Sequence, residues 1–158
     1  MPVEKGYKIN IGGLINRNNM NHWVITEKNI DANFIFEQLE KLSFQIQKQT
    51  VIILDNASIH KAKIIKQQLN FWEKRGLYLF FLPPYSPHLN IAETLWRKIK
   101  KEQIDPIDYL NQETLSYAVN RCLAQLGKSW KINFTEFNIN LFISGTYNCI
   151  SSTYLNKK

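Results

Sequence analysis

The sequence predicts one α/β domain in which an antiparallel hairpin and a parallel pair of strands share a mixed sheet. Residues 7–15 and 22–26 are rich in β-forming side chains and are separated by an asparagine-rich turn, which predicts the hairpin. Residues 51–54 and 77–82 are short, continuous apolar runs, typical of strands that are buried on both faces. A helical pattern lies between these two runs, so the strand, helix and strand predict a parallel crossover unit. A chain of 158 residues is long enough for one domain with a sizeable core.

Four helices are expected around this sheet. Asp31 is a suitable N-cap for the first, which should run to about residue 47, and the second should end at Gly76 after two basic residues. Asn90 is a suitable cap for the third, and the fourth should span residues 112–126. The expected apolar stripes are Ile35, Leu39, Leu42 and Ile46; Ala62, Ile65, Leu69 and Trp72; Ala92, Leu95, Trp96 and Ile99; and Leu115, Val119, Cys122 and Leu126.

The charge of the chain favours an anionic partner. It has 20 Lys and Arg against 13 Asp and Glu, a formal net charge of +7, which suits nucleic acid although many basic proteins bind none. No apolar run approaches the roughly 20 residues that span a bilayer, and the N-terminus lacks the apolar core of a signal peptide, so we expect a cytoplasmic protein without a membrane partner. Cys122 and Cys149 have no partner at metal-ligand spacing and are interpreted as reduced, structural thiols.

Two acidic residues stand where a site would be expected. Asp55 directly follows the strand at 51–54, and Glu93 lies in the first helical turn after the proline-rich loop at 83–90. The crossover unit between them should return the chain to the same end of the sheet, and hard cations such as Mg²⁺ take carboxylate and phosphate oxygens. Taken singly, each acid fits a structural role better than a catalytic one: Asp55 is suited to capping the next turn, and Glu93 stands three residues after Asn90, at the spacing of a capping box.

Other polar residues near these acids are candidates for DNA contacts. His60 is suited to orienting a water or touching a phosphate, and the basic cluster after Glu93 is suited to following a DNA backbone, but a cap and a solvated helix face are simpler explanations. Tyr85 is suited to stacking on a base, as is Trp96, whose apolar stripe favours the core instead. The DNA-contact candidates are Asn56, His60, Lys61, Tyr85, Arg97, Lys98 and Lys101.

The segment "ILDNASIHKAK" at 53–63, followed by "FLPPYSPHLNIAETLWRKIKK" at 81–101, resembles the catalytic core of the IS630/Tc1-mariner superfamily of DDE transposases. The resemblance implies an RNase H-like mixed sheet over residues 1–126, with residues 127–158 left as an unassigned tail. It also implies three acidic residues that bind two divalent metals, Mg²⁺ or Mn²⁺, with Asp55 as the second acid and Glu93 as the third. Such enzymes cut the inverted repeats at transposon ends and join them to target DNA.

Two departures from the family pattern bear on activity. Ile91 and Ala92 stand where the family often has a proline and an aliphatic residue, which leaves the acid in place. The family's first strand, with its aspartate, has no counterpart before the hairpin, and the expected upstream helix-turn-helix region is also lacking. Two hypotheses follow. In the first, this chain is the downstream product of a split reading frame in a cytoplasmic, nucleoid-associated transposase, and its expected protein partners are an upstream transposase fragment or a second copy of the chain. In the second, it is a truncated, inactive remnant that binds DNA or pairs with transposase.

Overall fold

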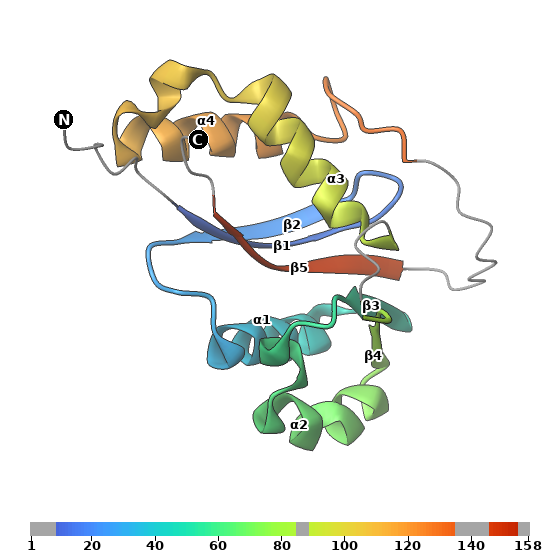
Figure 1. Cartoon of the computed structure of the whole chain (residues 1–158). Helices are drawn as coiled ribbons and strands as arrows, with labels where there is room; N and C mark the ends of the chain where they lie inside the picture. Colours follow the sequence, from blue (N-terminus) through green and yellow to red (C-terminus); the bar gives the residue numbers. More distant parts are fainter. Residues whose placement is uncertain (1–8, 85–88, 135–145, 155–158) are drawn as a thin grey trace.

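The computed structural model describes residues 9–84 and 89–134, and the backbone of residues 146–154. The chain forms three layers, with a five-stranded sheet between two pairs of helices (Figure 1). The strand order is β2-β1-β5-β3-β4, and only the β1–β2 and β1–β5 pairings are antiparallel. The predicted mixed α/β, RNase H-like class is therefore confirmed.

The hairpin consists of β1 (Asn10–Ile15) and β2 (Asn21–Thr26), paired in register from Asn10 opposite Thr26 to Ile15 opposite Asn21. Asn16 closes the turn, because its side-chain oxygen accepts hydrogen bonds from the backbone N–H groups of residues 18 and 20. Asn19 adopts a φ of 63°, a left-handed conformation that asparagine tolerates better than most residues. The Asn-rich sequence thus forms the turn that it predicts.

The parallel pair consists of β3 (Thr50–Leu54) and β4 (Leu77–Phe81), matched along their full lengths. The crossover helix α2 (Lys63–Lys74) lies on the same face as α1 (Ala32–Gln45), which ends two residues before the expected position. Gly76 adopts a φ of 90° after α2, so the chain reverses there into β4. The order of strand, helix and strand is the predicted one. The expectation that both strands are buried on both faces is wrong for β4, because β4 is an edge strand on which Tyr78 and Phe80 are exposed.

The opposite face is covered by α3 (Ile91–Lys98) and α4 (Gln112–Gln125). A π-helical turn (Ile99–Gln103) extends α3, and a 3₁₀ helix (Pro106–Leu110) leads into α4. The expected caps are present, since the side chains of Asp31 and Asn90 accept backbone N–H bonds at the first turns of α1 and α3. None of the helices in the part of the chain that is described is long and apolar enough to cross a membrane.

Each face of the sheet has its own hydrophobic core, so the sheet is buried by helices on both sides. Alternation along β1 sends Ile11 and Ile15 toward α3 and α4, while Gly12 lies under the ring of Phe34 on α1. Trp96 is 3% exposed and belongs to the core, as its place on the apolar stripe indicates. The core under α1 and α2 includes Ile35, Leu39, Ile52, Leu54, Ile65, Trp72 and Leu77.

The centre of the sheet is occupied by β5 (Thr146–Tyr154), which comes from the segment 127–158 for which the sequence predicts no element. It runs antiparallel to β1 and parallel to β3, and so joins the hairpin to the parallel pair (Figure 1). No strand precedes β1 in the chain from residue 9 onward. The family's first strand is expected to be lacking from this chain. In the structure β5 lies between β1 and β3, so the sheet is continuous without that strand.

Candidate functional site

Asp55 begins the site at the carboxyl end of β3. Its side-chain Oδ1 accepts a hydrogen bond of 3.0 Å from the backbone N–H of Ala57, which makes the turn that was considered as its structural role. The side chain remains 35% exposed. The carboxylate is therefore held in one orientation at a strand end while still reaching the surface, which is the usual place for a ligand site in an open α/β sheet.

The buried imidazole of His60 contacts the carboxylate of Asp55. Its Nδ1 lies 2.8 Å from Oδ1 of Asp55 and 3.2 Å from the Asp55 backbone oxygen, so the proton is assigned to Nδ1, which donates. The His60 side chain is completely buried, and its Nε2 has no hydrogen-bond partner in the described structure. A contact between His60 and a DNA phosphate would require the ring to leave this position, and in this structure the ring contacts Asp55 instead.

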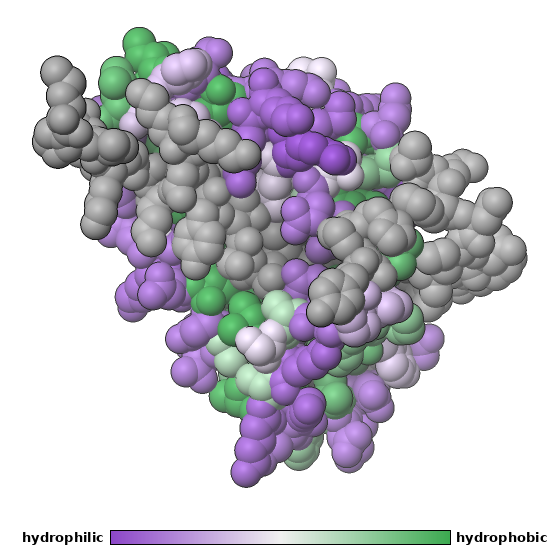
Figure 2. Space-filling model, viewed as in Figure 1, coloured by the Kyte–Doolittle hydropathy of each residue, from purple (hydrophilic) through white to green (hydrophobic). Residues whose placement is uncertain are grey.

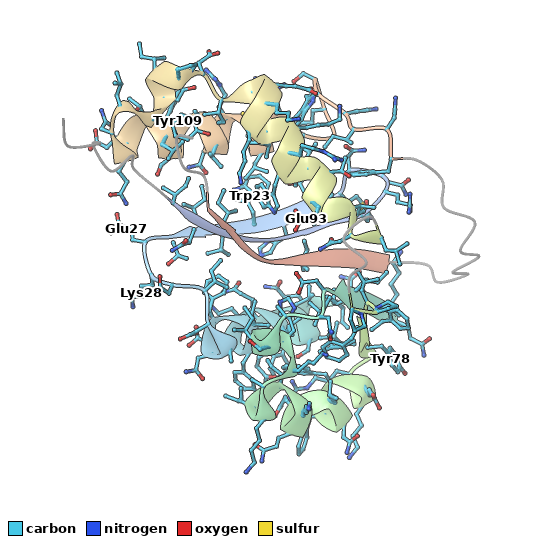
Figure 3. The ribbon with its side chains drawn as sticks, viewed as in Figure 1. Trp23, Glu27, Lys28, Tyr78, Glu93 and Tyr109 are labelled. Carbon is cyan, nitrogen blue, oxygen red and sulfur yellow. The ribbon has the colours of Figure 1, made fainter. Side chains whose placement is uncertain are left out.

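Glu93 lies in the first turn of α3 and is exposed. The N-cap bond of this helix is made by Asn90, whose Oδ1 accepts from the backbone N–H of Ala92 at 3.1 Å. A complete capping box would also need Glu93 to accept the backbone N–H of Asn90, and the described contacts contain no such bond. Helix capping therefore does not account for the Glu93 carboxylate, which Figure 3 shows at the end of α3 that lies over the sheet.

The two acids belong to the same end of the sheet. Leu54 and Phe81 are paired at the carboxyl ends of β3 and β4. Asp55 and the segment that leads to α3 therefore leave the sheet at the same end of the strands. The helix α3 then packs across β5, which is paired with β3, and across β1, the next strand in the sheet. The crossover unit therefore returns the chain to the same end of the sheet, as predicted.

Basic side chains continue from Glu93 along the exposed side of α3. Arg97 follows Glu93 by one helical turn and is exposed, and its guanidinium contacts only the Thr94 hydroxyl, at 3.4 Å, among the described groups. Lys98 is paired with Glu102 at 3.4 Å, whereas Lys101 is exposed. Figure 2 shows hydrophilic side chains gathered over α3. Arg97 and Lys101 are thus better placed than Lys98 to meet a phosphate.

The remaining DNA-contact candidates are distributed around the end of β3. Asn56 and Lys61 are half-buried in the turn and the 3₁₀ helix (Ser58–Lys61) that follow Asp55. Tyr85 lies outside the described residues. The link between His60 and Asp55 is not among the predicted contacts, although the short separation of the two residues in "LDNASIH" is the signal for it.

Asp55 and Glu93 have the carboxylate oxygens that a hard cation prefers, but two carboxylates are fewer than the three acids that the family resemblance implies. Mg²⁺ is commonly held by one or two carboxylates together with water and substrate phosphate, which Asp55 and Glu93 can supply from the protein side. Within the described ranges, however, no group of three His, Cys, Asp or Glu is placed to hold a metal ion. The central strand β5 adds no carboxylate, because its sequence is TYNCISSTY. A centre with three acids and two metals is therefore incomplete in this part of the chain.

A model of the family described as "DDE superfamily endonuclease" matches residues 2–116. The match spans the hairpin, both strands of the parallel pair and both candidate acids, and the chain belongs to this family. The domain is thus of the transposase nuclease type, a class that acts on DNA and generally uses divalent metals. Comparison with curated proteins gave no match.

Proposed function

We propose that this chain is the catalytic core of an IS630/Tc1-mariner transposase and acts in DNA cleavage and strand transfer at transposon ends once a third acid is supplied. The observation that carries the proposal is the setting of the two acids: Asp55 is fixed by His60 at the end of β3, and Glu93 is exposed on α3 without a capping role. The substrates are the terminal inverted repeats and the target DNA. The chain would then act in the cytoplasm, at the nucleoid.

We assign each residue of the site a different role according to its side-chain chemistry. Asp55 and Glu93 are assigned as two ligands of Mg²⁺ or Mn²⁺, and the cation supplies charge stabilisation at the phosphate. His60 keeps Asp55 in one rotamer, because its buried ring has no room to follow a moving carboxylate. Arg97 and Lys101 hold the DNA backbone next to Glu93.

The proposal is tested by the effect of Mn²⁺ on DNA affinity, measured by fluorescence anisotropy with a labelled duplex. Because phosphate oxygens complete the coordination of a hard cation, Mn²⁺ should tighten binding of duplex DNA by the intact chain. Asp55→Asn and Glu93→Gln should each remove this increase without weakening metal-free binding, because each variant only removes a negative charge near the phosphates. Glu113→Gln is the matched control, since Glu113 is an exposed carboxylate in the first turn of α4. An equal Mn²⁺ effect in all four proteins would reject both acids as ligands.

A second function is favoured by one observation, the lack of a third carboxylate in the described site. On this alternative the chain is a catalytically inactive module that binds DNA or pairs with a transposase, as a homodimer or with an upstream fragment. Calorimetric titration with Mn²⁺ separates the two. Heat of binding that depends on Asp55 supports the nuclease core, and its complete absence, with or without DNA, supports the inactive module.

A further inference from the structure

The hairpin carries few large apolar side chains on the face that it turns toward α1 (Figure 1). On this face Gly12 and Leu14 of β1 lie opposite Val24 and His22 of β2. A Cβ atom at residue 12 would come within 2.6 Å of the ring of Phe34, so this ring covers the glycine. No residue of β2 is buried, whereas four of the five residues of β3 are. The side chains of the hairpin therefore leave the space next to α1 partly unfilled.

The side of α1 that faces the hairpin is mostly polar. Four of its residues recur at intervals of three or four and so lie on one side of the helix: Phe34, Gln38, Lys41 and Gln45. All four line the space beside the hairpin, and only Phe34 is apolar. The buried side chains of α1, such as Leu39, belong to the core shared with α2. Polar side chains thus occupy the helix positions from which the space beside β2 could be filled.

A cavity of about 270 Å³ lies between α1 and the hairpin as a result. Leu14, Val24 and Leu39 contribute to an apolar wall, and Leu39 is buried. The exposed side chains of Lys41 and Gln45 stand at the opening. Small-molecule sites commonly measure about 300–1,000 Å³ and combine a mostly apolar wall with a few polar groups. The cavity therefore has the character of a small-molecule site, and its volume limits the ligand to a compact one.

The polar groups around the cavity have no partners within the part of the chain that the structure describes. Lys41 and His22 take part in no ion pair there, and the amides of Gln38 and Gln45 take part in no hydrogen bond. The described lining also contains no Asp or Glu. Four side chains with N–H donors, one of them a lysine, thus surround an apolar space. This combination is complementary to an organic anion, because carboxylate oxygens accept such donors while an apolar body fills the interior.

We propose that the cavity between α1 and the hairpin is a binding site for a compact amphipathic carboxylate. The aromatic ring or short branched chain of the ligand packs between Leu39 of α1 and Val24 of β2, and its carboxylate accepts hydrogen bonds from Lys41 and the neighbouring glutamine amides. Burial of the apolar body supplies most of the affinity, and the lysine selects the anion over a neutral molecule of the same shape. The cavity shares no residue with the site at Asp55 and Glu93, so binding there is independent of the proposed function.

The site is tested by titrating the isotope-labelled intact chain with para-isopropylbenzoate and following its backbone amide signals by nuclear magnetic resonance. The signals of residues 12–14, 22–24 and 38–45 should shift together along one saturable curve, whereas those of α4, on the opposite face of the sheet, should not. The neutral para-isopropylbenzamide should bind at the same place up to about fivefold more weakly, because it keeps the apolar body but loses an exposed ion pair. Absence of saturable shifts with the benzoate, or shifts centred on other residues, would overturn the site.

Two substitutions separate the charge from the apolar wall. Lys41→Met removes the ammonium but keeps a straight side chain, so it should reduce the affinity for the benzoate to that for the benzamide. Lys48→Met is the matched control, because Lys48 is an exposed lysine just after α1 that does not line the cavity. Val24→Trp should fill the cavity from β2 and abolish binding of both probes.

Each variant has an outcome that contradicts the proposal. Equal benzoate affinity in Lys41→Met and Lys48→Met would overturn the preference for an anion. Undiminished binding of both probes by a folded Val24→Trp chain would overturn the location of the site.

Discussion

The Nδ1 of His60 lies 2.8 Å from Oδ1 of Asp55, and the imidazole is completely buried while the carboxylate is partly exposed. A buried donor thus holds an acid that reaches the surface at the end of β3. This arrangement is typical of residues that orient a metal ligand without touching the substrate.

The first prediction concerns His60. His60→Ala should lower the free energy of unfolding by about 2–4 kcal/mol, because a buried ring is replaced by a cavity. It should also abolish the Mn²⁺-dependent increase in DNA affinity, since Asp55 keeps the backbone N–H of Ala57 but loses the imidazole donor that orients it. His60→Asn, whose amide can donate to the same carboxylate, should recover the Mn²⁺ effect more fully than the stability. Urea unfolding and anisotropy measure the two effects, and a parallel loss of both in the two variants would assign His60 a packing role only.

Arg97 is predicted to contact a DNA phosphate. Removal of one phosphate contact lowers the slope of log affinity against log salt by about 0.9 on duplex DNA, so Arg97→Ala should reduce the slope by about that amount. Arg121→Ala changes an exposed arginine on α4 and serves as the control. Anisotropy titrations at several salt concentrations give both slopes. Equal slopes for Arg97→Ala and the unmodified chain would place the DNA elsewhere.

The carboxylate of Glu40 should make stability depend on pH. It accepts hydrogen bonds from Trp72 Nε1 at 2.6 Å and from Arg75 at 3.1 Å, and these contacts, the Trp72 bond first, lower the pKa of Glu40 below its ordinary value of 4.5. Because the folded pKa is the lower one, the stabilisation is complete above the ordinary value and is lost as the pH falls through the folded pKa.

The measurement is the urea midpoint at a series of pH values between about 6 and about 3, the range in which carboxylates titrate. Glu40→Gln should lower the midpoint near neutral pH and flatten its fall in acid. Glu37→Gln removes an exposed carboxylate from the same helix and should leave the curve nearly unchanged. Curves of the same shape for Glu40→Gln and the unmodified chain would show that this network does not link stability to pH.

Cys122 is predicted to be unreactive in the folded chain. It is 1% exposed, and burial raises the pKa of its thiol, so little thiolate is present and little of it is accessible. In a Cys149→Ser background, a disulfide reagent should label Cys122 slowly at about pH 8, below the usual thiol pKa of about 8.5, and rapidly in urea. Rapid labelling without urea would indicate that α4 opens from the sheet on the timescale of the reaction.

The sequence by itself determined the elements whose signals are local. The caps at Asp31 and Asn90, the turn at Asn16 and the reversal at Gly76 each depend on a hydrogen bond or a backbone angle within a few residues. The apolar runs of β3 and β4, joined by one helix, likewise allow only one common pairing. These signals were enough to predict the hairpin, the crossover unit and the placement of both acids at one edge.

The tertiary structure alone decided what fills the centre of the sheet and how Asp55 is held. The polar sequence of β5 gives no pattern of a central strand, and its pairing with β1 and β3 joins residues more than 90 positions apart. The burial of His60 also depends on elements that surround it rather than on its neighbours in sequence. Such contacts form because buried backbone N–H and C=O groups need hydrogen-bond partners once the layers have packed. The local sequence predicts them poorly, because strand propensity depends strongly on tertiary context.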